Sequence, residues 1–348
     1  MKILITGGAG FVGSHAAEYY AKKGDEVVVL DNLSRSKSIY SKLNPLYNWD
    51  YLKKYENIDR INADITNSEE IEKFTQDIDA IIHTAGQVAV TPSINDPRQD
   101  FKINAQGTFN VLEAARKSKN HPAVVYCSTN KVYGENINSI PLKEGEWKYQ
   151  FKDKKFLNGI PTGFPIDLTE HTPYGCSKLC GDIYAQDYGL RNEVATGIFR
   201  MSCIYGTRQF GAEEQGWLVH FIISTLFDIG VTIYGDGKQV RDVLFVSDLI
   251  AAFDSFIKNR DKLSGQVFNI GGGSENTLSL LELLNIIEKE TGKRSNIHYD
   301  DWRPSDQKVY ISDISKAKDL LSWSPRISAK KGIKKSIQWI KDNEAYFK

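Results

Sequence analysis

The sequence has no surplus of charge and no long apolar run, and each absence argues against a class of function. Its 348 residues include 44 basic and 44 acidic side chains, so the formal net charge at pH 7 is zero. A nucleic acid or an anionic membrane is therefore not expected as the main partner, because either would favour a basic face. No segment approaches the roughly 18 consecutive apolar residues of a transmembrane helix. We expect a cytoplasmic protein that binds neither nucleic acid nor membrane.

Cysteine is also scarce. The four residues Cys127, Cys176, Cys180 and Cys203 are too few for a disulfide framework in a chain of this length. Cys176 and Cys180 lie one helical turn apart, but no His or Asp set completes a metal site around them. We expect reduced, packed thiols and no metal.

Apolar runs alternate with amphipathic stretches along the first two thirds of the chain. Strands are predicted at 2–6, 26–30, 80–83, 123–127 and 195–200, and helices at 12–23, 101–118 and 174–190. Runs of Val and Ile without polar alternation indicate strands covered on both faces, as in parallel βαβ units. The sequence therefore predicts an α/β fold with a Rossmann-like, doubly wound parallel sheet, which binds ligands at the carboxyl ends of its strands.

The pattern becomes less regular after about residue 200. Helices are predicted near 218–227, 247–257, 279–291 and 329–343, with short strands near 232, 267 and 297. We predict a Rossmann-like domain over 1–200, to which 245–275 returns, and a smaller C-terminal lobe formed by 201–244 and 276–348. The polar, aromatic segment 135–172 fits either a surface insertion or an active-site loop, and we favour the loop.

A glycine-rich turn joins the first predicted strand to the first helix. Residues 6–13 read TGGAGFVG, with Gly7, Gly10 and Gly13 spaced by three. Such a turn allows the backbone to approach a pyrophosphate closely and directs the N–H groups of a helix toward the anion. Phe11 and Val12 belong to the same turn, and we predict that all five residues contact a dinucleotide.

Asp31 ends the second predicted strand, eighteen residues past Gly13. A carboxylate at this position accepts hydrogen bonds from the ribose hydroxyls and repels a 2′-phosphate, so NAD is favoured over NADP. Arg35 is the residue that supports the NADP alternative. Asn32, Ser34 and Arg35 are included among the cofactor-binding candidates.

Two further strand ends supply cofactor candidates. Asp64 and Ile65 close a short apolar segment and fit either an adenine contact or a solvated strand end. Ala85 and Gln87 follow the strand at 80–83, where small residues allow the backbone to run beside a ligand. His83 is expected to be a packed strand residue.

A tyrosine followed four residues later by a lysine places both side chains on one helix face. The pattern occurs three times, as Tyr19/Lys23, Tyr174/Lys178 and Tyr234/Lys238. The second pair alone begins a long helix, for which Thr172 is a plausible N-cap and Pro173 a first-turn residue. It also follows a strand whose end, Thr129, can supply a hydroxyl.

Oxidation of a sugar carbinol requires a base for the hydroxyl proton, and a free phenol with a pKa near 10 is too weakly acidic. We expect the Lys178 ammonium and a cationic nicotinamide to lower the pKa of Tyr174. Thr129 can hold the same substrate oxygen as charge develops, and Lys178 can also bind the nicotinamide ribose. The predicted catalytic set is Thr129, Tyr174 and Lys178.

These motifs resemble those of the extended short-chain dehydrogenases/reductases, the NAD-dependent sugar-nucleotide epimerases and dehydratases, over nearly the whole chain. Further support comes from INAQGT at 103–108, VYG at 132–134 and RDV at 241–243. The resemblance implies that Asn104 orders the active-site helix and its water, and that Arg241 and Arg303 hold a substrate diphosphate in the C-terminal lobe. Without it, both arginines fit solvated loops equally well. It also implies a homodimer or homotetramer that pairs helices 101–118 and 174–190.

Within this family, three stretches resemble the CDP-paratose 2-epimerases: STNKVYG at 128–134, HTPYGCSK at 171–178, and YGTRQFG at 205–211 with QGW at 215–217. Sugar-nucleotide 4,6-dehydratases place an Asp-Glu pair directly after the catalytic Thr, whereas this chain has Asn130-Lys131, which disfavours dehydration. The additional substrate candidates are Asn130, Arg208, Gln209 and Gln215, besides Thr129.

The expected reaction is C2 epimerisation of a CDP-linked deoxyhexose. The C2 hydrogen is not acidic because no carbonyl adjoins it, so transient oxidation to a 2-keto sugar, rotation of that sugar and return of the hydride to its opposite face are expected. A 4-epimerase or a net oxidoreductase acting on a UDP- or GDP-hexose stays open as the alternative. The nucleotide base and the deoxygenation pattern of the sugar also stay open.

Overall fold

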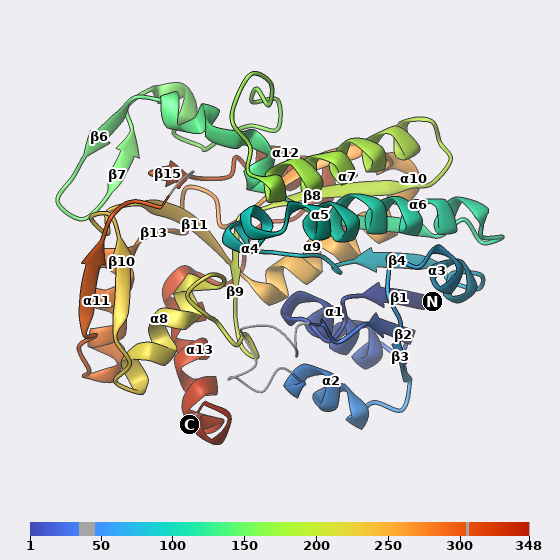
Figure 1. Ribbon diagram of the computed structural model, residues 1–348, viewed down its shortest axis with the longest axis horizontal. Coiled ribbons are helices and arrows are strands. Elements are labelled where there is room, and N and C mark those ends of the chain that lie inside the picture. The colour runs from blue at the N-terminus through green and yellow to red at the C-terminus, as the bar shows by residue number, and fades with distance from the viewer. Residues whose placement is uncertain (35–45, 304–305, 348) are drawn as a thin grey trace.

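A seven-stranded parallel sheet forms the centre of the computed structural model, which describes residues 1–34, 46–303 and 306–347 (Figure 1). Its order is β12-β8-β5-β4-β1-β2-β3. The strands are β1 (Lys2–Thr6), β2 (Glu26–Asp31), β3 (Ile58–Asn62), β4 (Ala80–His83), β5 (Ala123–Thr129), β8 (Thr196–Met201) and β12 (Gln266–Ile270). The chain builds outward from β1 on one side and from β4 on the other, so the strand order reverses between these two neighbours. This switch point is where a doubly wound sheet opens a crevice for ligands.

Helices cover both faces of the sheet and bury its apolar strands. On one face α1 (Phe11–Lys22) and α9 (Val246–Lys258) pack Tyr20 and Phe253 into a core cluster with Ile3 and Ile5 of β1. On the other, α3 (Ser68–Phe74), α6 (Gly107–Lys117) and α7 (Pro173–Leu190) cover the alternate strand residues, such as Leu4. The predicted Rossmann-like α/β fold is confirmed.

One predicted helix is interrupted. The stretch predicted as a single helix over 101–118 consists of α5 (Pro97–Phe101), a π-helical turn η4 (Lys102–Gln106) and α6. The helical segment begins earlier than predicted because the Asp96 side chain accepts a hydrogen bond from the Gln99 N–H and caps α5. Single π-helical turns are frequent at functional sites, and this one contains Asn104.

The C-terminal lobe is organised around β11 (Val240–Phe245), which pairs with β13 (Thr277–Ser279), β15 (Val309–Tyr310) and β9 (Cys203–Tyr205). A separate pair joins β10 (Val231–Tyr234) and β14 (Ile297–Asp300). Helices α8 (Trp217–Leu226), α11 (Leu280–Thr291) and α13 (Ala329–Asp342) pack against these strands in their own core cluster. The stretch 245–275 contributes α9 and β12, and β12 pairs with β8 of the large sheet.

The remaining short helices of the chain are α2 (Tyr47–Tyr51), η3 (Leu52–Lys54), α4 (Val90–Asn95), α10 (Arg260–Leu263), α12 (Ser315–Leu321) and η7 (Glu344–Tyr346).

The segment 135–172 packs against the C-terminal lobe. It contains the end of η5 (Asn130–Ser139), a hairpin of β6 (Leu142–Glu144) and β7 (Tyr149–Phe151), and η6 (Lys154–Phe156). Phe151 and Phe156 join Tyr310 in an apolar cluster, and the Ile160 N–H donates to the Ile311 carbonyl at 2.7 Å. The segment therefore braces the strand β15.

Across the described ranges, no helix has both the length and the apolar character needed to cross a membrane. The cytoplasmic location stays a prediction.

Candidate active site

A cavity of about 1050 Å³ lies where the strands of the large sheet end and the C-terminal lobe begins. Most of the predicted site residues line it. On the cofactor side they are Gly7, Gly10, Phe11, Val12, Gly13, Asp31, Asn32, Ser34, Asp64, Ile65, Ala85, Gln87, Tyr174 and Lys178, and on the substrate side Thr129, Asn130, Gln209, Gln215, Arg241 and Arg303. Asn104 and Arg208 do not line it, and Arg35 lies outside the described residues.

The glycine-rich turn fits the backbone of a dinucleotide closely. Gly7 has a φ of +72°, and a Cβ there would lie 2.5 Å from the Ala85 nitrogen, so only glycine is accommodated. The Gly10 N–H donates to the Gly7 carbonyl at 3.0 Å and closes the turn. Helix α1 then begins after Gly10 with neither a side-chain cap nor an acidic residue in its first turn. The helix N-terminus therefore presents its N–H groups to the cavity, as binding of a pyrophosphate requires.

Two carboxylates are held rigidly at the strand ends beside this turn. Asp31 accepts hydrogen bonds from the Ala9 N–H at 3.0 Å and the Leu33 N–H at 2.8 Å. Asp64 accepts from the Thr66 N–H at 2.8 Å and from Asn32 Nδ2 at 2.9 Å. Burial works to raise the pKa of Asp64, but these hydrogen bonds outweigh it and hold the pKa below its usual value. Both side chains are thus positioned as hydrogen-bond acceptors, the property that recognition of adenosine hydroxyls needs.

Asn104 lies behind the cavity wall and joins two of its segments. The side-chain Oδ1 accepts from the Gln87 N–H at 2.9 Å. Its Nδ2 lies 3.1 Å from each of three acceptors: the Gln87 carbonyl, Asp100 Oδ1 and Ser177 Oγ. The π-helical turn that contains Asn104 therefore ties the segment after β4 to helix α7. Asp100 and Ser177 escaped the sequence analysis, because no motif marks them and only the fold brings them to Asn104.

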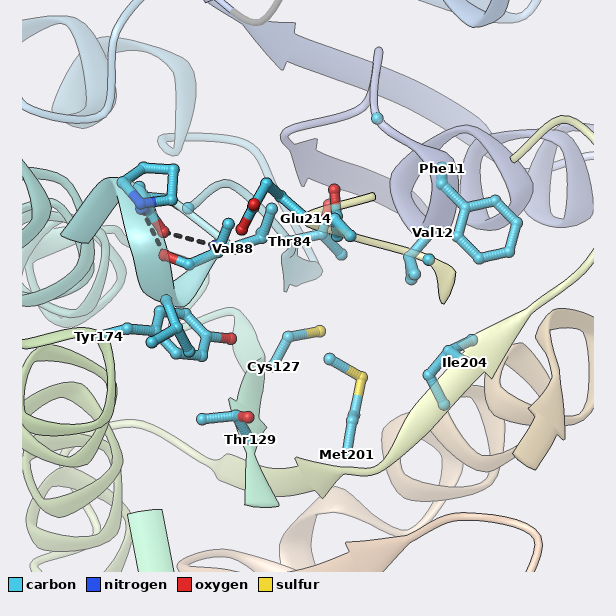
Figure 2. A pocket seen from close by; sticks show the side chains of 18 of the residues that line it. Phe11, Val12, Thr84, Val88, Cys127, Thr129, Tyr174, Met201, Ile204 and Glu214 are labelled. Atoms are coloured by element: carbon cyan, nitrogen blue, oxygen red, sulfur yellow. Dashed lines mark hydrogen bonds between the residues drawn. The ribbon is translucent and has the colours of Figure 1, made fainter. Parts of the chain in front are cut away.

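The three predicted catalytic residues come from two elements. Thr129 ends β5, and Tyr174 and Lys178 occupy the first turns of α7, whose N-cap Thr172 accepts from the Gly175 N–H at 3.2 Å. Figure 2 shows the Tyr174 ring and the Thr129 side chain projecting into the same pocket, next to Cys127 and Met201. The Thr129 hydroxyl acts to lower the pKa of the Tyr174 phenol. The structure thus brings together two hydroxyls that could hold one substrate oxygen.

The charges of the two α7 residues differ from the expectation. Burial raises the pKa of Tyr174 to about 12, although the Thr129 hydroxyl acts in the opposite direction. Burial also lowers the pKa of Lys178 to about 8, against the raising effects of Cys127, Asp182 and Asp100. The expectation that the Lys178 ammonium lowers the pKa of the phenol is therefore wrong for the chain by itself, because desolvation is the largest effect on both groups.

Lys178 packs beneath the site. Its ammonium lies 4.5 Å from the centre of the Tyr126 ring, and the Tyr126 hydroxyl donates to the Lys178 carbonyl at 2.9 Å. The whole residue is only 6% exposed. This packing fixes the side chain at the cavity edge.

The three arginines predicted to bind substrate have different surroundings. Arg241 lines the cavity and pairs with Asp306 at 2.6 Å. Arg303 also lines it, stacked 3.9 Å from the Tyr234 ring and paired with Glu213 at 3.1 Å.

Arg208, in contrast, is buried away from the cavity. It pairs with Glu18 and stacks 4.2 Å from the Tyr51 ring. The predicted contact of Arg208 with substrate is therefore not supported. The sequence offers no sign of this, because Glu18 and Tyr51 lie far from it along the chain.

The remaining polar candidates line the cavity with their side chains partly engaged. Asn130 Nδ2 donates to Gln307 Oε1 at 3.3 Å, and Gln209 Nε2 donates to the Ile204 carbonyl at 3.3 Å. Gln215 belongs to a tight hairpin in which its backbone exchanges two hydrogen bonds with Ala212.

The structure differs from the sequence analysis along other parts of the cavity wall. No residue of 135–172 is among the cavity-lining residues that the structure describes, so the active-site loop predicted there is not supported. Its apolar side chains are buried against β15 instead. Conversely, Lys131, Glu213 and Glu214 line the cavity and were missed as contacts.

Within the described parts of the chain, no group of three or more His, Cys, Asp or Glu side chains is arranged to hold a metal.

Comparison with known proteins agrees with this geometry. Residues 3–271 match the model of the NAD dependent epimerase/dehydratase family. The chain is 39% identical to a CDP-paratose 2-epimerase of Salmonella typhi, over 97% of this chain and 99% of that one. It is 33% identical to a putative UDP-glucose 4-epimerase of Methanocaldococcus jannaschii, over 98% and 99%.

Among solved structures, the UDP-glucuronic acid 4-epimerase of Bacillus cereus in complex with UDP-glucuronic acid and NAD superposes with a TM-score of 0.82. The two chains are 29% identical, and the match covers 99% of this chain and 100% of that one. The glycine turn, the strand-end carboxylates and the shared cavity thus have a consistent explanation. The chain belongs to the NAD dependent epimerase/dehydratase family, as an enzyme whose cofactor is NAD.

Proposed function

We propose that this enzyme epimerises C2 of a CDP-linked deoxyhexose, a reaction of the CDP-paratose to CDP-tyvelose type, without net redox change. The observation that carries the proposal is the composition of the cavity wall. Thr129, Tyr174 and Lys178 meet there in reach of the glycine turn, while the two positions after Thr129 hold Asn130 and Lys131. The 39% identity to a CDP-paratose 2-epimerase supports the choice of C2 and of CDP.

Tyr174 is assigned as the group that takes the proton from the 2-hydroxyl and later returns it. Thr129 holds the same oxygen through its own hydroxyl, since both side chains project into the same pocket. When bound, NAD⁺ supplies a hydride acceptor and a positive charge beside the phenol. A positive charge is needed there, because burial alone raises the pKa of Tyr174 to about 12.

The side chains after Thr129 argue against dehydration. Elimination of water requires an acid and a base beside the reacting carbon, and Asn130 is a neutral amide whose Nδ2 already donates to Gln307. Lys131 carries no carboxylate and cannot take the place of either acidic residue. Proton transfer to and from a hydroxyl, by Tyr174, is the acid–base chemistry that this wall supports.

Arg241 and Arg303 are assigned to the substrate diphosphate. Both line the cavity, and each is held by a carboxylate, Asp306 or Glu213. A diphosphate would compete with these carboxylates for the guanidinium groups, which suit phosphate geometry. Anchoring at the diphosphate leaves the hexose able to turn, as transfer of hydride to its opposite face requires.

We also propose that the enzyme is a homodimer, or a tetramer built from such dimers, that pairs α6 and α7. Phe109 and Tyr184 lie on these two helices, with ring centroids 5.3 Å apart, and remain 37% and 42% exposed. Ile183 beside them is 51% exposed. An apolar patch shared by two adjacent helices suits a two-fold interface, in which each helix meets its counterpart.

The test uses the purified holoenzyme with a CDP-3,6-dideoxyhexose deuterated at C2, in ordinary water. We expect a 2-epimer that keeps its deuterium at C2, with no net accumulation of NADH. Loss of the label to solvent would contradict the oxidation route and favour enolisation. Turnover of UDP- or GDP-hexoses at C4, with none of CDP-hexoses at C2, would replace the proposed reaction by the 4-epimerase alternative.

A further inference from the structure

Lys131 is a cation placed directly beside the predicted reacting centre. It follows Thr129 by two residues in the first turn of η5, and its backbone N–H donates to Thr129 Oγ1 at 3.3 Å. Lys131 also lines the same cavity as Thr129 and Tyr174. The turn therefore fixes the position of the lysine relative to the hydroxyl assigned to hold the reacting oxygen.

The charged neighbours of Lys131 are those of the predicted diphosphate site. Its ammonium interacts electrostatically with Arg241 and Asp306, which are themselves paired at 2.6 Å, and also with Glu135. Burial, together with the nearby Arg241 guanidinium, lowers the pKa of Lys131. Two basic side chains, Lys131 and Arg241, thus adjoin Asp306 on a desolvated wall, where an incoming phosphate would meet both.

The chemistry of a nucleotide sugar links this cation to the position of the reaction. The diphosphate is attached at C1, so a hydroxyl on C2 is on the adjacent carbon, whereas a hydroxyl on C4 lies across the ring. If Thr129 and Tyr174 hold the reacting oxygen, a lysine fixed beside Thr129 meets the sugar-linked phosphate only when the reacting carbon is next to C1. With C4 at the same place, that phosphate would lie on the far side of the sugar.

We propose that Lys131 binds the sugar-linked phosphate and thereby favours substrates that present C2, rather than C4, to Thr129 and Tyr174. The proposal rests on the function proposed above and deepens it, by assigning the selection of the reacting carbon to one side chain. The ligand group that Lys131 recognises is the β-phosphate of a nucleoside diphosphate. Arg241 then shares that phosphate with Lys131.

The test compares Lys131→Met with Lys131→Arg, and uses Lys143→Met as the control because Lys143 is an exposed lysine of β6 that does not line the cavity. Binding of CDP and of CMP to each NAD-loaded protein is measured by calorimetry. We expect Lys131→Met to weaken CDP about tenfold, with little change for CMP, which lacks the sugar-linked phosphate. Lys131→Arg should restore most of the affinity, and Lys143→Met should match the wild type. Retention of NAD and an unchanged thermal midpoint report whether each variant is folded.

Steady-state kinetics on the CDP-hexose then tests the contribution of Lys131 to C2 epimerisation. We expect Lys131→Met to lower kcat/KM for C2 epimerisation at least tenfold, mostly through KM. Equal losses for CDP and CMP, or no loss for either, would overturn the assignment of Lys131. These outcomes are separable from failure of the proposed function, which would be seen as absence of C2 epimerisation by the wild-type enzyme.

Discussion

Two helices carry a tyrosine and a lysine at the same spacing, yet their surroundings differ. At the end of α1, the Tyr19 hydroxyl donates to Asp254 at 3.0 Å and the Lys23 ammonium pairs with the same carboxylate at 2.9 Å. One acidic side chain thus engages both members of the pair. In this arrangement the lysine is neutralised and the phenol proton is held by an anion.

At the start of α7 the corresponding groups meet a hydroxyl and an aromatic ring. Tyr174 projects into the pocket beside Thr129 (Figure 2), and Lys178 lies over the Tyr126 ring. The pKa of both phenols is raised to about 12, chiefly by burial, and a negative charge adds to the effect at each, that of Asp254 at Tyr19 and that of Asp100 at Tyr174. At Tyr19 the carboxylate also accepts a hydrogen bond directly from the phenol. A cation brought into the α7 site can offset desolvation there, whereas Asp254 holds Tyr19 in its protonated form. We therefore expect the tyrosine and lysine of this pattern to be reactive only where no carboxylate binds both side chains directly.

The two tyrosine–lysine pairs should differ most in how much activity is lost when the phenol hydroxyl is removed. Tyr174→Phe should lower kcat by about 10³-fold or more, because the base for the sugar hydroxyl is lost. NAD should remain bound, since the glycine turn and Asp31 are untouched. Tyr19→Phe is the matched control and should leave kcat within about twofold of the wild type. Turnover of the CDP-hexose by both variants is the measurement, and near-normal activity of Tyr174→Phe would remove it as the base.

The two pairs should differ less in how much activity is lost when the lysine is replaced. Lys178→Met should reduce kcat about 10²-fold, because the ammonium is expected to bind the nicotinamide ribose and so to hold the hydride acceptor against the substrate. It should also lower the fraction of NAD that remains bound after gel filtration, measured by absorbance of the denatured supernatant. Lys23→Met should change neither quantity, because Lys23 pairs with Asp254 and is not among the residues that line the cavity. Equal losses of kcat and of bound NAD for the two substitutions would mean that Lys178 has no role in catalysis beyond that of Lys23.

Local patterns predicted most of the large sheet. The strands predicted at 2–6 and 80–83 coincide with β1 and β4, because uninterrupted Val, Ile and Leu runs report burial on both faces. Strand β3, at the edge of the sheet, was not among the predicted strands, since Ile58–Asn62 has three polar residues in five and is only partly buried. The glycine-rich turn could also be predicted from the sequence, because its function depends on a backbone conformation that the spacing of the glycines indicates.

The parts of the site that escaped prediction depend on contacts between distant residues. Nothing near Asn104 signals a π-helical turn, which accompanies hydrogen bonds from its side chain to the Gln87 backbone. Likewise Arg208 and Arg241 both lie in motifs, and only the fold assigns one to Glu18 and the other to the cavity. Sequence spacing identifies candidate groups, but the neighbours that set their charge and direction come from tertiary structure.

The two lysines should also have opposite effects on stability. The folded-state pKa of Lys178, about 8, lies below its value of about 10.5 in the unfolded chain, so the cost of burying its charge is complete below pH 8. That cost decreases between pH 8 and 10.5, where the unfolded state binds more protons than the folded state and the free energy of unfolding rises with pH.

With NAD removed, Lys178→Met should therefore raise the free energy of unfolding by about 2–3 kcal/mol at pH 7, and by clearly less at pH 9.5. Lys23→Met should instead lower it by about 0.5–1 kcal/mol, a modest loss because Lys258 still pairs with Asp254 at 2.6 Å. Urea unfolding at both pH values measures these changes, and destabilisation by Lys178→Met at pH 7 would show that its ammonium is compensated in the fold as fully as that of Lys23.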